Sequence, residues 1–238
     1  MSCALCKRNK PLLNSHIIPE FLYQELYDGL HRFHRISTAP EARNRLLQKG
    51  LREPLLCGDC EQHFSVWERY ASHVLFGGMS LSGTREESKI RIVNLDYAKF
   101  KLFQLSILWR AGVSSRPEFR QIRLGPHQER LRAMLLASNP GLPQDYPCLM
   151  FIVLNEGRPI GDLIVEPSWS RLDGHKCYRF VFGGMAWIQA ASGHCLARVI
   201  LDSCLKQDGS CVIRLQDWRE MKFLVDTTQK LAASGKLD

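Results

Sequence analysis

The chain has 238 residues, a mass of 27.3 kDa and a formal net charge of +8 at pH 7. Hydrophobic residues make up 45% of it and charged residues 24%, which is typical of a soluble globular protein and excludes disordered, collagen-like and coiled-coil chains. No apolar run approaches ~18 residues, so we expect no membrane-spanning helix and no membrane partner. The N-terminus, MSCALCKRNK, lacks the apolar core of a secretory signal, so we expect a cytoplasmic protein.

We expect an α+β fold built from three segments, of which the first is residues 1–76. A short helix is predicted near Pro19. The polar and basic stretch Asp28–Gly50 is predicted to be mostly loop, with some helix over Glu41–Gln48. A firmer helix is predicted from Cys60 to about Phe76. It has apolar residues at helical spacing, namely Phe64, Trp67, Ala71, Val74 and Leu75.

The second segment, residues 77–146, is predicted to be a basic helical region. Tyr97–Ala111 is apolar nearly all round, which is typical of a buried central helix. Another helix is predicted over Pro126–Ala137. Residues 77–140 hold 11 Lys or Arg against five Asp or Glu. This excess favours a polyanionic partner such as nucleic acid, although a merely soluble basic surface has the same composition.

The third segment, residues 147–238, is predicted to be an antiparallel β region of four or five strands with a C-terminal helix from Trp218 to about Ala233. Short apolar or alternating runs, separated by turn clusters, indicate the strands. These runs are Cys148–Leu154, Gly161–Val165, Tyr178–Phe182, Met185–Ala190 and Cys211–Leu215. We expect this region to pack on the central helices.

The nine cysteines divide into two kinds. Five are dispersed among apolar residues, as small buried side chains are. Cys3, Cys6, Cys57 and Cys60 instead form two Cys-x-x-Cys pairs, and in a reducing compartment such pairs indicate a metal site more than disulfides. Two tight turns can aim four thiolates at one ion, so we predict structural zinc. The alternatives are four free thiols or, for one pair alone, a redox-active dithiol.

A second motif lies between the two pairs: Asn14-Ser15-His16-Ile17-Ile18-Pro19. Together with the first Cys-x-x-Cys and the later Leu-Leu-Cys-x-x-Cys-Glu, it resembles the zinc-bound branch of the HNH endonucleases over roughly residues 1–76. The resemblance implies an N-terminal treble-clef-like ββα-metal zinc module, followed by the central helices and the C-terminal antiparallel sheet. Residues 97–146 also resemble the helical part of bacterial proteins of this type.

The resemblance implies two catalytic residues. His16 corresponds to the general base, since a neutral imidazole can take a proton from water near pH 7. Glu61 follows the last cysteine, at the position of the family's metal-ligating histidine, and a carboxylate suits a catalytic Mg or Mn ion. Ser15 replaces an aspartate ligand of many relatives. No asparagine stands near Arg52, where Glu53 offers a second carboxylate.

Each of these residues also has a structural interpretation. His16 could be a hydrogen-bonded histidine within a zinc module, and Glu61 could be an acidic residue that favours a helix N-terminus. We expect His63 to point away from Glu61 at the surface. Glu68, two helical turns beyond Glu61, is expected to lie too far away to share one metal ion with it.

The leading functional hypothesis is a metal-dependent endonuclease that hydrolyses phosphodiester bonds in DNA in preference to RNA, with a bacterial antiviral defence role. One alternative is a non-catalytic zinc-stabilised nucleic-acid-binding protein. Another is an adaptor whose C-terminal sheet docks a protein partner such as an ATPase. In the first two cases the basic residues of the second segment would contact phosphates. These are Arg85, Lys89, Arg91, Lys99, Lys101, Arg110, Arg116, Arg120, Arg123, Arg130 and Arg132.

Overall fold

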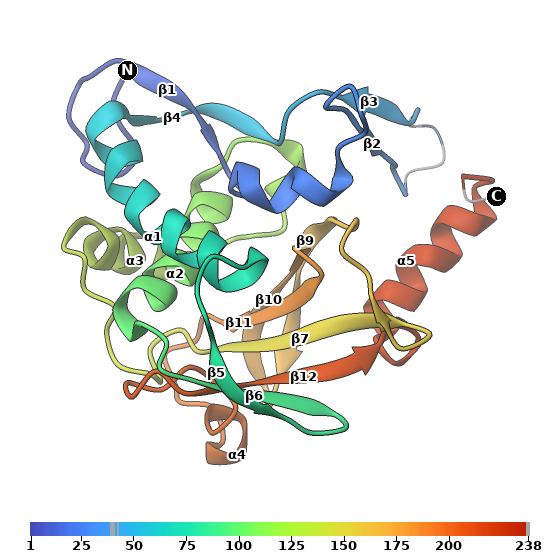
Figure 1. The fold of residues 1–238 in the computed structure, drawn as a ribbon. Helices are drawn as coiled ribbons and strands as arrows, with labels where there is room; N and C mark the ends of the chain where they lie inside the picture. The colour runs from blue at the N-terminus through green and yellow to red at the C-terminus, as the bar shows by residue number, and fades with distance from the viewer. Residues whose placement is uncertain (39–40, 42, 237–238) are drawn as a thin grey trace.

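The computed structural model describes residues 1–38, 41 and 43–236, and it is a mixed α+β fold (Figure 1). A large mixed sheet lies beneath α1 (Gly58–Phe76), α2 (Tyr97–Val113) and α3 (His127–Leu136). The N-terminal strands lie across the opposite side of these helices. None of the helices within the described ranges is both long and apolar enough to cross a membrane.

The N-terminal region is organised around two short antiparallel sheets. Strand β1 (Leu12–His16) pairs with β4 (Arg52–Cys57), and β4 leads directly into α1. The short 3-10 helix η1 (Glu20–Leu26) follows β1, close to the helix predicted near Pro19. Strands β2 (Phe33–Arg35) and β3 (Arg45–Leu47) form the second sheet.

The helix predicted over Glu41–Gln48 is wrong, because β3 occupies its second half. Phe33 is buried, and its ring lies 5.4 Å from that of Tyr23 and 5.8 Å from that of Tyr27. This packing anchors β2, and Leu47 pairs opposite Phe33 in the hairpin. Tertiary contacts therefore override the helical propensity. Residues 39, 40 and 42 lie outside the described ranges.

The predicted helices form close to their expected bounds. Helix α1 starts at Gly58 rather than Cys60, and α2 covers the whole of the predicted Tyr97–Ala111 helix. The side chain of Asp96 caps α2 by accepting a hydrogen bond from the Lys99 backbone N–H at 3.0 Å. At the C-terminus the single predicted helix is divided into the 3-10 helix η3 (Trp218–Glu220) and α5 (Lys222–Ala233).

The large sheet has eight strands in the order β5-β6-β12-β7-β11-β10-β9, with β8 paired to β7. Two of its strands, β5 and β6, come from the segment that was expected to be helical. The bounds are β5 (Ser82–Arg85), β6 (Lys89–Val93), β7 (Cys148–Asn155), β8 (Arg158–Pro159), β9 (Val165–Leu172), β10 (His175–Phe182), β11 (Met185–Ala190) and β12 (Cys211–Asp217).

The sheet is mixed, so the prediction of a purely antiparallel C-terminal sheet is wrong. Strand β12 runs parallel to β7, with Ile213 opposite Met150. After β11 the chain passes through α4 (Arg198–Leu201) and returns on the other side of β7, and a crossover of this kind allows parallel pairing. The strand predicted over Gly161–Val165 is also displaced, because β9 begins at Val165.

Helix α2 is the centre of the core. Twelve of its residues are buried, because α1 and α3 cover it on one side and the sheet on the other. The ring of Phe103 lies 6.3 Å from that of Trp187 on β11, in an edge-on arrangement. Two buried residues of α2 are cations, Lys101 and Arg110, each 1% exposed. The Nζ of Lys101 donates to the Tyr146 carbonyl at 3.0 Å.

We predict that Lys101→Met stabilises the fold near neutral pH. Burial lowers the pKa of Lys101 from 10.5 to about 8, so below pH 8 the folded state holds a desolvated charge. The unfolded state binds the extra proton between the two pKa values, so wild-type stability rises with pH over that window. The variant should therefore gain up to about 3 kcal/mol of unfolding free energy at about pH 7, and this gain should shrink by about pH 10.

Denaturant unfolding at both pH values measures this difference. Lys99→Met is the matched control, since Lys99 is exposed and pairs with Asp96 at 2.8 Å. A gain for Lys101→Met that does not change with pH would contradict the prediction.

Candidate metal centre and the neighbouring acid–base cluster

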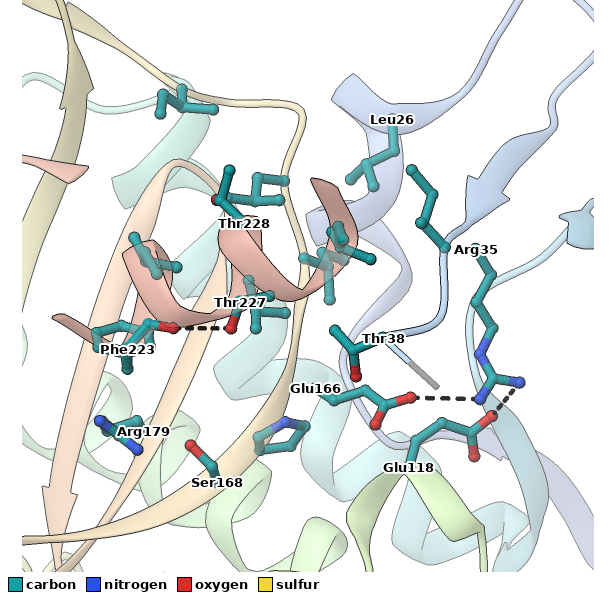
Figure 2. A pocket seen from close by; sticks show the side chains of 18 of the residues that line it. Leu26, Arg35, Thr38, Glu118, Glu166, Ser168, Arg179, Phe223, Thr227 and Thr228 are labelled. Carbon is teal, nitrogen blue, oxygen red and sulfur yellow. Dashed lines mark hydrogen bonds and ion pairs between the residues drawn. The ribbon is translucent and has the colours of Figure 1, made fainter. Parts of the chain in front are cut away.

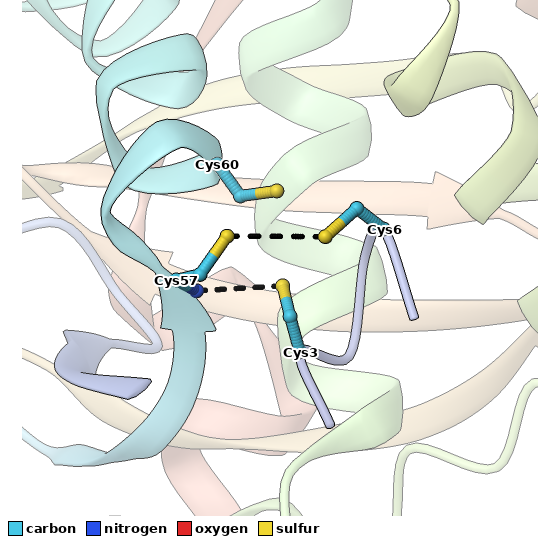
Figure 3. A group of neighbouring side chains, drawn as sticks. All are labelled: Cys3, Cys6, Cys57 and Cys60. Atoms are coloured by element: carbon cyan, nitrogen blue, oxygen red, sulfur yellow. Dashed lines mark hydrogen bonds between the residues drawn. The ribbon is translucent and has the colours of Figure 1, made fainter. Parts of the chain in front are cut away.

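The four paired cysteines meet in space, as Figure 3 shows. Their sulfur atoms all lie within 4.8 Å of one another, and the Cys6 and Cys57 sulfurs are 3.8 Å apart. Cys3, Cys57 and Cys60 are buried, whereas Cys6 is partly exposed. A tetrahedral zinc–thiolate site with bonds of about 2.3 Å has sulfur–sulfur edges of about 3.8 Å. The cluster therefore has the composition and size of a four-cysteine metal site.

Local backbone geometry creates this cluster. In the first pair, the Lys7 N–H donates to the Cys3 carbonyl at 2.9 Å, and Lys7 has a φ of 61°, so the chain turns tightly. The Ala4 N–H donates to the Leu55 carbonyl at 3.0 Å, which fastens this turn to β4. In the second pair, Cys57 ends β4 and Cys60 lies in the first turn of α1.

Charges around the cluster favour a thiolate at its exposed side. Hydrogen bonding from Arg8 lowers the pKa of Cys6 from 9.0 to about 6. Burial raises the pKa of Cys60 instead, so a cation is needed to keep this thiol deprotonated. Asp59, at the start of α1, holds Lys10 at 2.5 Å and Arg8 at 3.4 Å. Both basic side chains are thereby kept beside the cluster.

A second polar group begins at the end of β1, where His16 lies next to η1. The His16 Nε2 is 2.6 Å from the Glu20 Oε2, and the Tyr27 hydroxyl donates to the Glu20 Oε1 at 2.6 Å. The His31 ring stacks on that of Tyr27 with centroids 3.8 Å apart. Glu20 thus accepts a hydrogen bond from Tyr27 with one carboxylate oxygen and places the other at ion-pair distance from the imidazole. Within the described residues, neither Nε2 of His16 nor Oε2 of Glu20 has a hydrogen-bond partner, so their contact is an ion pair.

Burial sets the protonation of this histidine. It lowers the pKa of His16 below 6.5, while the negative charge of Glu20 opposes that shift and the positive charge of Arg52 adds to it. His16 is therefore mostly neutral at pH 7. A neutral imidazole that donates from Nε2 presents Nδ1 as a proton acceptor.

Arg110 joins this group to the helices. It is 1% exposed, its Nη1 donates to the His16 carbonyl at 2.9 Å, and the same atom lies 2.7 Å from the Glu68 Oε1. Its guanidinium also lies over the Phe64 ring, 5.4 Å from the centroid. One buried arginine of α2 therefore contacts both β1 and α1. A cation in this position cannot also contact a phosphate from solvent.

Glu61 lies nearby but is not paired with His16. Its side chain adjoins that of Ser15, and its Oε1 is buried without a hydrogen-bond partner. Burial raises the pKa of Glu61, although Ser15 and Arg110 oppose this. Among the described residues no hydrogen bond or ion pair links His16 with Glu61. The carboxylate paired with the imidazole is that of Glu20.

Several other expectations need correction. His63 is half-buried rather than at the surface, with its Nε2 3.0 Å from the Leu135 carbonyl of α3. Glu68 influences both Glu61 and His16 electrostatically, and its own carboxylate is paired with Arg110 at 2.7 Å; that it lies too far from Glu61 to share one metal ion stays a prediction. Glu53 accepts from the Ser115 N–H at 3.1 Å and so holds the loop after α2. Lys101 and Arg110 are buried and do not contribute to a basic surface.

Sequence reasoning missed Glu20 and the role of Arg110. The spacing His16-x-x-x-Glu20 was a usable signal, because Pro19 starts a helical turn that can bring the two together. Arg110 had a weaker signal, namely a charge inside an otherwise apolar helix. Such a charge is expected to find a buried partner.

No family model, curated protein or solved structure matches the chain. Within the described ranges, the four cysteines are the one group of three or more metal-binding side chains that converges on a point.

We predict that the four cysteines bind one zinc ion per chain and that its removal destabilises the fold. Cys60→Ser should abolish stoichiometric zinc and lower the thermal midpoint by about 10 °C or more, because the buried site then lacks a ligand. Cys195→Ser is the control, since Cys195 is exposed and lies outside the cluster. Elemental analysis and thermal unfolding before and after chelation measure both effects, and equal zinc in the two variants would contradict the assignment.

Proposed function

We propose that residues 1–76 form a zinc-stabilised ββα-metal module of the HNH type, and that the protein is a metal-dependent endonuclease acting on DNA in preference to RNA. The observation that carries the proposal is the His16 imidazole, with its Nε2 2.6 Å from Glu20, at one end of the β1–β4 strand pair whose other end carries Cys57 of the four-cysteine cluster. The sequence resemblance assigns the same histidine as the base. A role in antiviral defence is part of this proposal and rests on the resemblance alone.

The chain order supports the module. β1 and β4 pair antiparallel and α1 follows at once, so the strand that ends in His16 and the helix that carries Glu61 are joined in one β–β–α unit beside the four cysteines. Ser15 is 2% exposed, and its hydroxyl accepts from the Leu56 N–H at 3.0 Å. This bond fixes β1 on β4 immediately before the proposed base.

In the proposed reaction His16 acts as the general base. Its Nδ1 takes a proton from a water molecule, the resulting hydroxide oxygen bonds to phosphorus, and the phosphorus–oxygen bond to the leaving sugar oxygen breaks. The leaving oxygen takes a proton from solvent, which gives a phosphate monoester and a hydroxyl end. Glu20 stabilises the imidazolium that forms, and Tyr27 keeps the Glu20 carboxylate in place.

Glu61 is the residue that fits a catalytic cation. Its buried Oε1 has no partner, and Mg²⁺ sites commonly use one or two carboxylates completed by water and substrate phosphate. Glu68 is less suited, because Arg110 already holds its Oε1. A bound Mg²⁺ or Mn²⁺ would stabilise the negative charge on the phosphate in the transition state.

Exposed cations of the N-terminal module support a nucleic-acid substrate. Arg43, Arg45 and Lys49 are exposed on or beside β3, in the same module as His16. By contrast, Arg35 is bound by Glu118 and Glu166, and Arg32 by Asp28. Contacts of the exposed cations to phosphates would position the substrate without reading its sequence.

A non-catalytic nucleic-acid-binding protein is the second candidate. It is favoured by Ser15, which serves a structural hydrogen bond at the position where many relatives carry a metal-ligating aspartate. In this case His16, Glu20 and Arg110 would only hold β1 on the helices.

We predict that His16→Ala abolishes cleavage while leaving the fold and bound zinc intact. Loss of the base should slow hydrolysis of linear DNA in the presence of Mn²⁺ or Mg²⁺ by about 100-fold or more. His73→Ala is the matched control, since this histidine lies in the last turn of α1, at the far end from the cysteine cluster. Substrate that is bound yet uncut by the wild-type protein would favour the non-catalytic candidate instead.

We predict a pH profile set by His16. Because burial lowers its pKa, the cleavage rate should rise as pH increases through a value below 6.5 and stay constant above about pH 7, where the base form dominates. Glu20→Gln removes the charge that opposes this shift, so the midpoint should move to lower pH. The plateau rate should also fall by about tenfold or more, because the imidazole loses its orienting carboxylate.

Glu25→Gln is the control for this experiment, because Glu25 lies on the same short helix and makes no contact with His16 within the described residues. An unchanged midpoint in Glu20→Gln would show that Glu20 does not act on the base.

A further inference from the structure

One cavity of the described structure is separate from the cysteine cluster and from His16. It has a volume of about 760 Å³ and lies between the N-terminal region, the strands β9 and β10, and α5 (Figure 2). This volume falls within the range of about 300–1,000 Å³ that is usual for small-molecule sites.

Most of the cavity wall is apolar. Aromatic and aliphatic side chains reach it from η1, β2, η2 (Pro117–Phe119), the loop before β9, and α5. They include Tyr23, Phe33, Phe119, Leu163, Trp218 and Phe223. Such a lining suits the apolar body of an organic molecule.

Arg179 supplies a cation on this apolar wall. The side chain comes from β10, and its guanidinium lies over the Phe223 ring, 4.6 Å from the centroid. Its Nε is buried without a hydrogen-bond partner, and Nη2 reaches only the Trp169 carbonyl at 3.4 Å. Burial lowers the pKa of Arg179, while the negative charge of Asp226 opposes that shift. Within the described residues no carboxylate lies within 4.0 Å of this guanidinium.

Several other charged residues line the cavity, namely Arg35, Glu118, Asp162, Glu166, Asp226 and Lys230. Arg35 is bound by Glu118 at 3.1 Å and by Glu166 at 3.3 Å. Asp226 faces the cavity from α5, and its carboxylate is held by Lys222 at 3.1 Å. Among the described residues, Arg179 therefore differs from Arg35 in that no carboxylate lies within 4.0 Å of it and Asp226 acts on it only at longer range.

A hydroxyl group lies beside the guanidinium. Ser168 on β9 is directly opposite Arg179 on β10, so the two side chains project from the same face of the sheet, as Figure 2 shows. Both residues line the cavity. A guanidinium and a hydroxyl at one end of an apolar cavity are the donors that recognise an anionic group.

We propose that this cavity binds a small organic anion, with its phosphate or carboxylate group on Arg179 and Ser168 and its apolar body among the aromatic side chains. The anion provides the direct ion-pair contact that the half-buried guanidinium does not make with Asp226. This site is independent of the endonuclease proposal, because it shares no residue with the cysteine cluster or with the His16 and Glu20 pair.

Binding of 8-anilinonaphthalene-1-sulfonate to the full-length protein tests the proposal, since this fluorescent probe is itself an apolar body with one anionic group. The wild-type protein should bind one molecule per chain. Arg179→Met keeps the packing on Phe223 but removes the charge, and it should weaken binding by about 10- to 100-fold. Arg171→Met is the matched control, because Arg171 is exposed on β9 and does not line the cavity. It should bind the probe as the wild type does.

A second variant makes the test independent of the folding of Arg179→Met. Ser168→Tyr leaves Arg179 in place and fills the space beside it, so it should also weaken binding of the probe. Circular dichroism and thermal unfolding establish that each variant is folded.

Competition distinguishes the two kinds of anionic group. Displacement of the probe by adenosine monophosphate but not by adenosine assigns a phosphate, and displacement by 2-naphthoate but not by 2-naphthol assigns a carboxylate. The proposal is overturned if the wild type does not bind the probe, or if Arg179→Met binds it as tightly as Arg171→Met. It is also overturned if the uncharged compounds displace the probe as well as the anions do.

Discussion

The convergence of four cysteine sulfurs is the constraint on which the N-terminal third of the molecule depends. It ties positions 3 and 6 to positions 57 and 60, and so closes the loop of residues 7–56 at a single point. Within the described part of that loop, the strand pairings are those of β1 with β4 and of β2 with β3. Such short strands have little stability alone, so a metal ion bound by the four cysteines would help to hold the strand that ends in His16.

A buried arginine, Arg110, also holds β1, by joining it to the helices. Arg110 contacts the His16 backbone, Glu68 on α1 and the Phe64 ring, so one side chain of α2 connects three elements of the core. Its charge is matched by Glu68, and removal of either partner alone would leave an uncompensated buried charge. Arg110 holds β1 in the same way whether the protein is an endonuclease or a non-catalytic nucleic-acid-binding protein. The two candidates differ in whether His16 Nδ1 takes a proton during hydrolysis.

The features that could be predicted from the sequence are those determined by residues close together in the chain. The cysteine pairs and the apolar helix of residues 97–111 could be predicted because spacing and composition determine them locally. The polar edge strand β5 could not, since all its side chains are exposed and its pairing with β6 is the only reason it forms. The pairing of Glu20 with His16 and the cavity at Arg179 could not be predicted for a similar reason. Glu20 meets His16 through a turn of unpredicted geometry, and the cavity is lined by segments that are distant in the sequence.

The position of β12 has a consequence for the order of assembly. This strand pairs with β6 on one side and β7 on the other, although it is the last strand in the chain. Until the ribosome has released residues 211–217, the ribbon of β5 and β6 and the four-stranded group β7, β11, β10 and β9 share no backbone hydrogen bonds. Before residues 211–217 have been synthesised, β6 and β7 each present a strand edge that is open to pairing with another chain.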